Sequence, residues 1–169
     1  GLIDALYIAT PNSDHFRYAD RAAELRIHVL CEKPLSHDEE EARRFLSTVR
    51  HSSVKSMVAY RLHFDPANLT AIEKAQSGEI GDLKFFNSIF SMQVNDRNNI
   101  RLKKEKGGGP LYDIGIYCIN ASRYLFRSEP IEVFAFSAKD PHDDRFLEVD
   151  EMLTVSMRFP DNRLATFTC

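Results

Sequence analysis

The sequence predicts an α/β protein in which part of a parallel sheet is followed by an α+β unit with an open, mostly antiparallel sheet. Three observations support this fold class. Short apolar strands alternate with amphipathic helices over residues 1–59, strands dominate residues 60–169, and one helical stretch at about 110–126 interrupts those strands. Apolar strands joined by helices are typical of a parallel sheet covered on both faces.

Residues 1–59 contain three predicted strands and two predicted helices. The strands lie at 4–10, 27–32 and 54–60. The first helix runs from about residue 14 to residue 26, with Asn12 or Ser13 as its capping residue. The second begins at a capping box formed by residues 36–39 and continues to about Arg50, with an apolar face repeating at helical spacing.

Residues 60–169 begin with a helix that starts at Asp65 and Pro66 and ends at Gly78, because these residue types favour helix starts and ends. Four strands are predicted after it, at 83–94, 131–138, 150–159 and 163–169. A turn at 160–162 joins the last two. Alternation in the first strand places Phe86, Phe90, Met92 and Val94 on one face.

Strand-forming residues occupy both ends of the sequence. Domains rarely leave apolar strands uncovered at both ends, because an unpaired strand edge promotes association. We therefore expect the chain to be truncated at both ends, or to receive partner strands from elsewhere.

Composition argues against several classes of protein. Lys and Arg number 22 against 25 Asp and Glu, a net charge of −3, which provides no basic surface for nucleic acid or an anionic membrane. No apolar run reaches the roughly 20 residues of a membrane-spanning helix. The 3 cysteines are far apart and indicate reduced thiols of a cytoplasmic protein. The 6 histidines lack the spacing of a metal site.

The first candidate site follows the strand at 4–10 and contains Thr10, Pro11, Asn12 and His15. Ligands of doubly wound sheets bind beyond the carboxyl ends of the strands, and a helix N-terminus offers free N–H groups to a ribose or phosphate. The alternative is an ordinary turn with His15 on the surface, and this motif alone favours the alternative.

The second candidate site is Glu32-Lys33-Pro34, also at the carboxyl end of a strand. Pro34 keeps Lys33 out of helical geometry. The Lys33 ammonium can exchange a proton with a reacting hydroxyl or stand beside it as a fixed charge, while Glu32 holds it in place. The alternative is a surface Glu–Lys pair, which contributes little to stability.

The third candidate site is a run of glycines at 107–109 followed by the predicted helix. A carboxylate one helical turn from a phenol suits hydrogen bonding to a carbinol and transfer of its proton. The alternative is a solvent-facing polar stripe, but Gly115 thins the helix and favours close approach of another group. The polar stripe consists of Asp113, Tyr117, Asn120 and Tyr124, and the packing face of Leu111, Ile114, Cys118, Ser122 and Leu125.

These three motifs in this order resemble the glucose–fructose oxidoreductase, inositol dehydrogenase and rhizopine-catabolism (Gfo/Idh/MocA) superfamily, over essentially the whole chain. Residues 59–66 match the pattern Ala-Tyr-Arg-x-His-x-Asp-Pro of the branch that contains glucose–fructose oxidoreductase and the NADP-dependent xylose and dihydrodiol dehydrogenases. Tyr117 stands where inositol dehydrogenases carry histidine, and residues 140–146 fit the same branch.

The resemblance implies a partial Rossmann-like dinucleotide-binding domain over residues 1–59, which lacks its first strand–helix–strand unit. It implies a substrate and dimerisation domain over residues 60–169, incomplete at its C-terminus. The implied activity is hydride transfer between NADP(H) or NAD(H), with NADP preferred, and the hydroxyl of a small sugar or polyol. The implied assembly is a homo-oligomer joined through the open sheet.

The resemblance also assigns roles to single residues. Tyr117 is the proton donor or acceptor, Lys33 stabilises its phenolate, and Asp113 orients the sugar. The family's Gly-x-Gly-x-x-Gly turn has no counterpart here, so we do not expect the chain alone to bind cofactor well. A non-catalytic regulatory or binding protein that retains the fold is the alternative function. The implied cofactor-binding residues are Thr10, Pro11, Asn12, His15, Glu32, Lys33 and Arg61.

Overall fold

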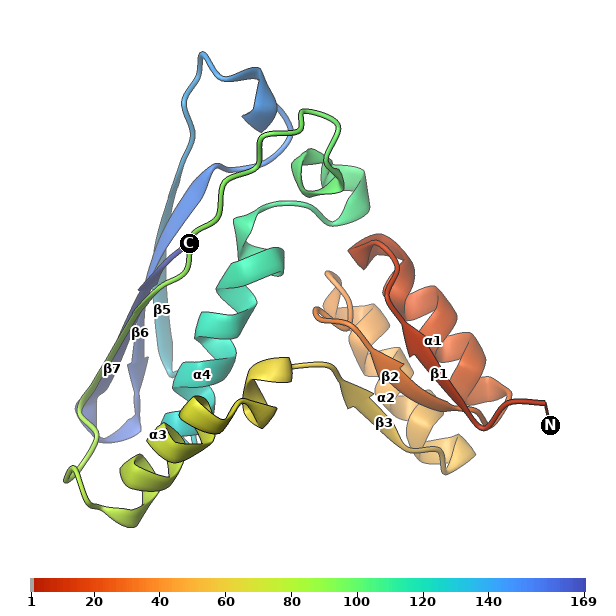
Figure 1. Ribbon diagram of the computed structural model, residues 1–169, viewed down its shortest axis with the longest axis horizontal. Helices are drawn as coiled ribbons and strands as arrows, with labels where there is room; N and C mark the ends of the chain where they lie inside the picture. The colour runs from red at the N-terminus through yellow and green to blue at the C-terminus, as the bar shows by residue number, and fades with distance from the viewer. Residues whose placement is uncertain (1) are drawn as a thin grey trace.

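The computed structural model describes residues 2–169 and contains two β-sheets (Figure 1). The first is parallel, in the order β1 (Ala5–Ile8), β2 (His28–Cys31), β3 (Ser56–Val58). The second is mixed, in the order β4 (Phe85–Ile89), β7 (Arg163–Thr168), β6 (Met152–Phe159), β5 (Glu132–Ala138). The predicted fold class is confirmed.

Two helices, α1 (His15–Glu24) and α2 (Glu39–Ser52), pack together against one face of the parallel sheet. Alanines on α1 allow close contact with the buried strand residues Val29 and Cys31. On the opposite face Tyr7 is 56% exposed and Met57 is 50% exposed. Within residues 2–169 the helices therefore cover only one face, and the prediction of cover on both faces is wrong for this part of the chain.

The starts of these two helices differ from the predictions. A short 3₁₀ turn, Asn12–Asp14, precedes α1, and no side chain caps it. The prediction of Asn12 or Ser13 as a cap is wrong, because the Asn12 amide bonds a distant loop instead. The cap of α2 is Asp38, whose Oδ1 accepts a hydrogen bond from the Glu41 N–H at 2.9 Å, so the capping box at 36–39 is also wrong.

The helix α3 (Pro66–Ser77) begins and ends as predicted. The Asp65 carboxylate accepts hydrogen bonds from the N–H groups of Ala67 and Asn68, both at 3.1 Å. Gly78 ends the helix with φ of 82°, a conformation that favours glycine. Both ends could be predicted from the sequence because the residues there bond backbone groups that a helix end leaves without partners, or adopt the conformation that ends the helix.

The helix α4 (Ile116–Phe126) follows a π-helical turn, Leu111–Gly115, and crosses the inner face of the second sheet (Figure 1). Ile114 of the turn and Cys118 and Phe126 of α4 are buried and pack against Met157 and Phe167 among others. A Cβ on Gly115 would lie 3.0 Å from Cys169 Sγ. The sequence predicts that another group approaches Gly115 closely. In the structure that group is the end of the second sheet, at Cys169.

The strand β4 is shorter than the predicted 83–94, and it runs parallel to β7 rather than antiparallel. Its strand register ends where Ile89 meets Thr168, and one further hydrogen bond joins the Phe90 N–H to the Thr168 carbonyl at 3.0 Å. Phe86 and Phe90 pack against the core as predicted, whereas Met92 is exposed. The other two strand pairings of this sheet are antiparallel.

The outer face of the second sheet, which α4 does not cover, carries exposed apolar side chains from three strands. By strand register they are Phe85, Ile89, Phe134, Phe136 and Leu164. Over residues 2–169, no helix is both long and apolar enough to cross a membrane.

The predicted domain boundary between residues 59 and 60 stays a prediction.

Replacement of Phe159 by Ala is expected to lower the free energy of unfolding by about 3–5 kcal/mol, because this ring is fully buried against Phe126. Urea unfolding followed by circular dichroism measures the change. The matched control is Phe64→Ala, at an exposed ring, which should have little effect. Equal effects of the two substitutions would contradict this core.

Candidate active site

The carboxylate of Asp113 lies between two cations from distant parts of the chain. Lys33 Nζ donates to Asp113 Oδ1 at 3.0 Å and to the Asp113 carbonyl at 2.6 Å. Arg101 Nε donates to Asp113 Oδ2 at 2.5 Å. The side chains of Lys33 and Asp113 are only 12% and 16% exposed, so solvent screens this cluster less than a surface ion pair.

The electrostatics of the cluster maintain Asp113 as a carboxylate. Burial by itself raises the pKa of Asp113. The hydrogen bonds and charges of Lys33 and Arg101 outweigh burial and hold that pKa below its ordinary value. Asp113 therefore acts here as a hydrogen-bond acceptor and a counter-ion rather than as an acid.

Tyr117 lies one turn along the helix, beside the same lysine. Lys33 Nζ is 5.1 Å from the centroid of the Tyr117 ring, over the ring rather than bonded to its hydroxyl. The rings of Phe90 and Tyr60 pack against it, with centroids 5.6 Å and 6.0 Å away. The three residues predicted to be catalytic, Lys33, Asp113 and Tyr117, thus meet in one place, although their roles stay predictions.

A cleft of about 240 Å³ lies next to this cluster, beyond the carboxyl ends of β1 and β2. It joins the first and second candidate sites to the glycine run at 107–109. Six of the seven predicted cofactor-binding residues line it: Thr10, Pro11, Asn12, His15, Glu32 and Lys33. No motif of the sequence indicates the opposite wall, which includes Ile100, Arg101 and Lys106.

A hydrogen bond from a side chain to the backbone joins two walls of the cleft. Asn12 Nδ2 donates to the Gly107 carbonyl at 2.8 Å. A Cβ on Gly107 would lie 2.8 Å from Asn12 Cβ, and one on Gly108 would lie 2.4 Å from the Arg101 carbonyl oxygen. A larger residue at 107 would push the loop away from the turn after β1, whereas one at 108 would clash with the loop's own backbone at Arg101 and Lys103.

His15 is 1% exposed, so the alternative of a surface histidine is wrong. Its Nδ1 lies 2.6 Å from the Pro34 carbonyl and its Nε2 lies 2.9 Å from the Thr10 carbonyl. The imidazole therefore links the turn after β1 to the segment after β2. This arrangement favours a positioning role in the cleft.

Glu32 does not hold the Lys33 ammonium, so that interpretation of the second candidate site is wrong. Its Oε1 accepts a hydrogen bond from the Tyr7 hydroxyl at 2.7 Å, while the Lys33 ammonium bonds Asp113 instead. The bond to Glu32 raises the pKa of Tyr7. The surface-pair alternative is also wrong, because the Lys33 partner lies 80 positions away in the chain.

Arg61 is the one predicted cofactor-binding residue that the structure does not bring to the cleft. It is exposed elsewhere on the surface. Arg101 occupies the cleft, but the sequence analysis missed it. A short 3₁₀ turn, Ile100–Leu102, positions it, because Asn99 Oδ1 accepts from the Arg101 N–H at 3.0 Å and Leu102 is buried. The asparagine cap was the available signal, but it does not indicate where the arginine points.

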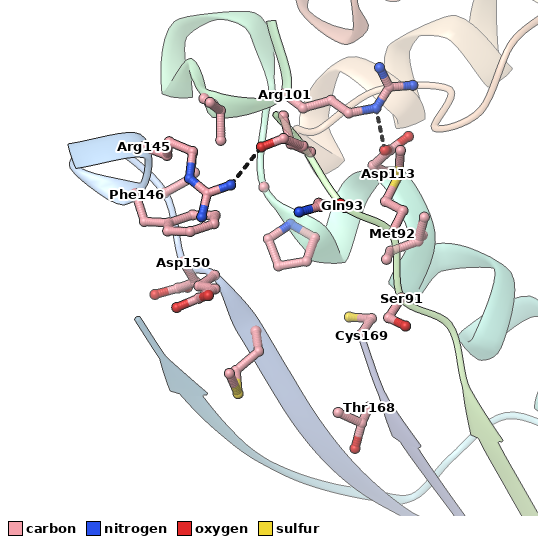
Figure 2. A pocket seen from close by; sticks show the side chains of 18 of the residues that line it. Ser91, Met92, Gln93, Arg101, Asp113, Arg145, Phe146, Asp150, Thr168 and Cys169 are labelled. Atoms are coloured by element: carbon pink, nitrogen blue, oxygen red, sulfur yellow. Dashed lines mark hydrogen bonds and ion pairs between the residues drawn. The ribbon is translucent and has the colours of Figure 1, made fainter. Parts of the chain in front are cut away.

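A larger pocket, about 700 Å³ in volume, lies on the other side of Asp113 (Figure 2). Arg101 and Asp113 stand at one end of it, and Arg145, Phe146 and Asp150 at the other (Figure 2). Arg145 Nη1 donates to the Val94 carbonyl at 2.8 Å, which ties the loop after β5 to the segment after β4. No group of three metal-ligating side chains converges anywhere in residues 2–169.

Two family models match the chain. The oxidoreductase family with an NAD-binding Rossmann fold matches residues 1–60, and the GFO/IDH/MocA C-terminal domain matches residues 68–169. The chain belongs to the Gfo/Idh/MocA oxidoreductase family. The resemblance drawn from the three sequence motifs is confirmed.

Relatives of this Gfo/Idh/MocA chain include the two dehydrogenase types that its motifs resembled. It is 35% identical over 171 residues to D-xylose 1-dehydrogenase (NADP⁺) of Haloarcula marismortui, a match that covers 98% of the chain and 47% of the relative. It is 32% identical over 167 residues to trans-1,2-dihydrobenzene-1,2-diol dehydrogenase of Danio rerio, covering 99% of the chain and 48% of the relative.

Solved structures show the same fold. The aldose-aldose oxidoreductase of Caulobacter crescentus, complexed with glycerol, superposes with a TM-score of 0.94 at 34% identity, over 98% of this chain and 50% of that one. A 3-ketoreductase of Actinomadura kijaniata with NADP and TDP-benzene superposes with a TM-score of 0.85 at 28% identity, with the same coverage. The Gfo/Idh/MocA chain thus spans about half the length of the curated relatives it matches.

Replacement of Asp113 by Asn is expected to lower the free energy of unfolding by about 2 kcal/mol near neutral pH, because Lys33 would lose its charged partner. The folded pKa of Asp113 lies below the unfolded value of about 3.9. Its contribution is therefore present above the unfolded pKa and is lost as pH falls through the folded pKa. The difference between wild type and variant should shrink in acid.

Urea unfolding at a series of pH values measures this difference. The control is Glu148→Gln, which removes an exposed carboxylate that pairs with Lys103 at 3.1 Å and should change stability little. An Asp113→Asn variant as stable as wild type at neutral pH would contradict the stabilising role of the cluster.

Proposed function

We propose that the chain carries the reaction centre of a nicotinamide-dependent oxidoreductase that transfers a hydride between NADP(H) or NAD(H) and a sugar or polyol hydroxyl. The observation that supports this most is the convergence of Lys33, Asp113 and Tyr117, in which Asp113 lines both the cleft and the larger pocket. The nicotinamide ring, when bound, supplies hydride exchange, while the protein contributes position and electrostatics.

The cleft has the chemistry of a site for part of a dinucleotide. It lies at the carboxyl ends of parallel strands, the usual ligand position of such sheets. Three cations, Lys33, Arg101 and Lys106, line it and suit a ligand that carries phosphates. Thr10, Pro11 and Asn12 would contact the cofactor, and His15 would hold their turn in place. One relative is named for its use of NADP⁺ and another was solved in complex with NADP, which supports NADP as the cofactor.

The larger pocket is the better place for the body of the substrate. Its wall carries polar side chains such as Ser91, Gln93 and Glu151 in addition to Asp113. Such a wall suits a ligand with several hydroxyls, each of which needs a hydrogen-bond partner when it leaves water. Two relatives are named for action on xylose and on aldoses, which supports a sugar or polyol.

Each residue of the cluster then has a distinct task. Asp113 holds the Lys33 ammonium and accepts a hydrogen bond from the substrate. The Tyr117 phenol donates or accepts the proton of the reacting hydroxyl. The Lys33 charge, 5.1 Å from the ring centroid, stabilises the phenolate that forms when Tyr117 gives up its proton. Phe90 and Tyr60 fix the orientation of the ring.

Replacement of Tyr117 by Phe is expected to lower kcat/KM by a factor of about 10²–10⁴, because it removes the proton donor while keeping the packed ring. Steady-state assays with aldoses and polyols, followed by nicotinamide fluorescence, measure the loss. Cofactor affinity should stay unchanged. The control is Tyr18→Phe, at an exposed ring on α1 that lines neither the cleft nor the larger pocket, which should retain activity.

Full activity in Tyr117→Phe would exclude the proton-transfer role of this residue. Wild type that binds NADP(H) but oxidises no sugar or polyol would favour the alternative, a regulatory or binding protein that retains the fold.

We also propose that the protein forms homo-oligomers through the outer face of its second sheet. The rings of Phe134 and Phe136 contact each other there with centroids 4.7 Å apart, and Phe136 is 68% exposed. Contiguous apolar surface of this kind is typical of protein–protein interfaces. A cytoplasmic location is proposed too, since Cys31, Cys118 and Cys169 are all free thiols, as is usual for proteins of a reducing compartment.

Replacement of Phe136 by Lys is expected to shift the protein toward monomer, because the new ammonium would lose its hydration in the interface. Sedimentation velocity over a series of concentrations measures the shift. The control is Phe64→Lys, at a similarly exposed ring outside the sheet. An unchanged distribution in Phe136→Lys would rule out this face as the interface.

A further inference from the structure

A third pocket, of about 340 Å³, lies between α3, α4, β4 and the segment that follows β3. It is separate from the cleft and from the larger pocket, since it shares no lining residue with either. Its volume is at the small end of the roughly 300–1,000 Å³ range of ligand pockets, so it suits one ring rather than a chain of groups.

The wall of this pocket is aromatic and carries no carboxylate, ammonium or guanidinium group. The rings of His63 and Tyr124 contact each other with centroids 4.5 Å apart, and Tyr60 is 6.1 Å from His63. Aliphatic side chains from α3 and α4 complete the surface. A charged ligand would lose its hydration here without gaining an ion pair, so the wall favours an uncharged ring with an apolar face.

Polar groups at the wall are free to bind such a ring. No hydrogen bond in the described part of the chain uses the side-chain amides of Asn68 and Asn120 or the hydroxyl of Tyr124. Asn68 and Asn120 are partly exposed, and Tyr124 is 44% exposed. Two amides and a phenol provide both donors and acceptors for oxygen atoms on the ligand.

The pocket adjoins the proposed reaction centre through Tyr117, which forms part of its wall. Lys33 lies by the same ring, with its Nζ 5.1 Å from the centroid. A second group of a substrate that reacts beside Tyr117 would have to pass that ring to enter the pocket, so Tyr117 is the point at which the two sites adjoin.

We propose that this pocket is a subsite for an uncharged second ring of the substrate, attached to the sugar or polyol that reacts at Lys33, Asp113 and Tyr117. The proposal rests on the proposed function for the identity of the first ring. It adds a specificity: two-ring substrates such as aryl glycosides or disaccharides bind better than single sugars.

The test compares two neutral probes, phenyl β-D-glucopyranoside and methyl β-D-glucopyranoside, whose Kd values are measured by isothermal titration calorimetry on the protein. The phenyl glycoside should bind about tenfold more tightly, because its second ring fills the pocket. Ala71 lines the pocket from α3 and is exposed, so Ala71→Phe should fill the pocket without disturbing a core. This variant should bind the two probes equally.

The control is Ala67→Phe, one turn earlier on α3 and outside the pocket wall, which should keep the tenfold preference. Tyr124→Ala removes part of the wall and should also reduce the preference, which provides a second test if Ala71→Phe does not fold. Equal binding of the probes by wild type, no binding of the phenyl glycoside, or a preference that survives both variants overturns the proposal.

Lys33→Met separates the two proposals. It should abolish turnover while keeping the preference for the phenyl probe, because Lys33 does not line the pocket. A wild-type protein with the preference but no hydride transfer would overturn the proposed function alone.

Discussion

The contact between Lys33 and Asp113 joins the two sheets of the protein at the point where its pockets meet. Lys33 follows a strand of the first sheet, and Asp113 lies in the π-helical turn that packs on the second. Because both side chains are largely buried, loss of Asp113 would leave the Lys33 charge with little solvent to compensate it. The cleft and the larger pocket both depend on this ion pair, since Asp113 lines each of them.

Backbone packing supports the same arrangement. The Asn12–Gly107 hydrogen bond and the lack of a side chain at Gly107 bring the loop before α4 against the turn after β1, and Gly108 lets the loop fold closely on its own backbone at Arg101. On the other side of the helix, Gly115 allows α4 to approach Cys169 closely. Both contacts limit where Asp113 and Tyr117 can lie, so the functional side chains are positioned by glycines that carry no chemistry of their own.

The sequence predicted most elements and most of the candidate site. The cap at Asp65 and the stop at Gly78 were predictable because they satisfy backbone groups within a few residues. The cap of α1 was not, because Asn12 bonds a residue 95 positions away. Arg101 was missed for the same reason: it lies in an irregular segment, and only its contact with Asp113 gives it a function.

The sequence by itself determined the family, the order of the elements and the three motifs, since each depends on local residue types and their spacing. The tertiary structure decided which charges pair, that β4 runs parallel to β7, and that an aromatic pocket lies behind Tyr117. These features join residues that are far apart in the chain. No local pattern encodes such contacts, because they depend on how the two sheets and their helices pack.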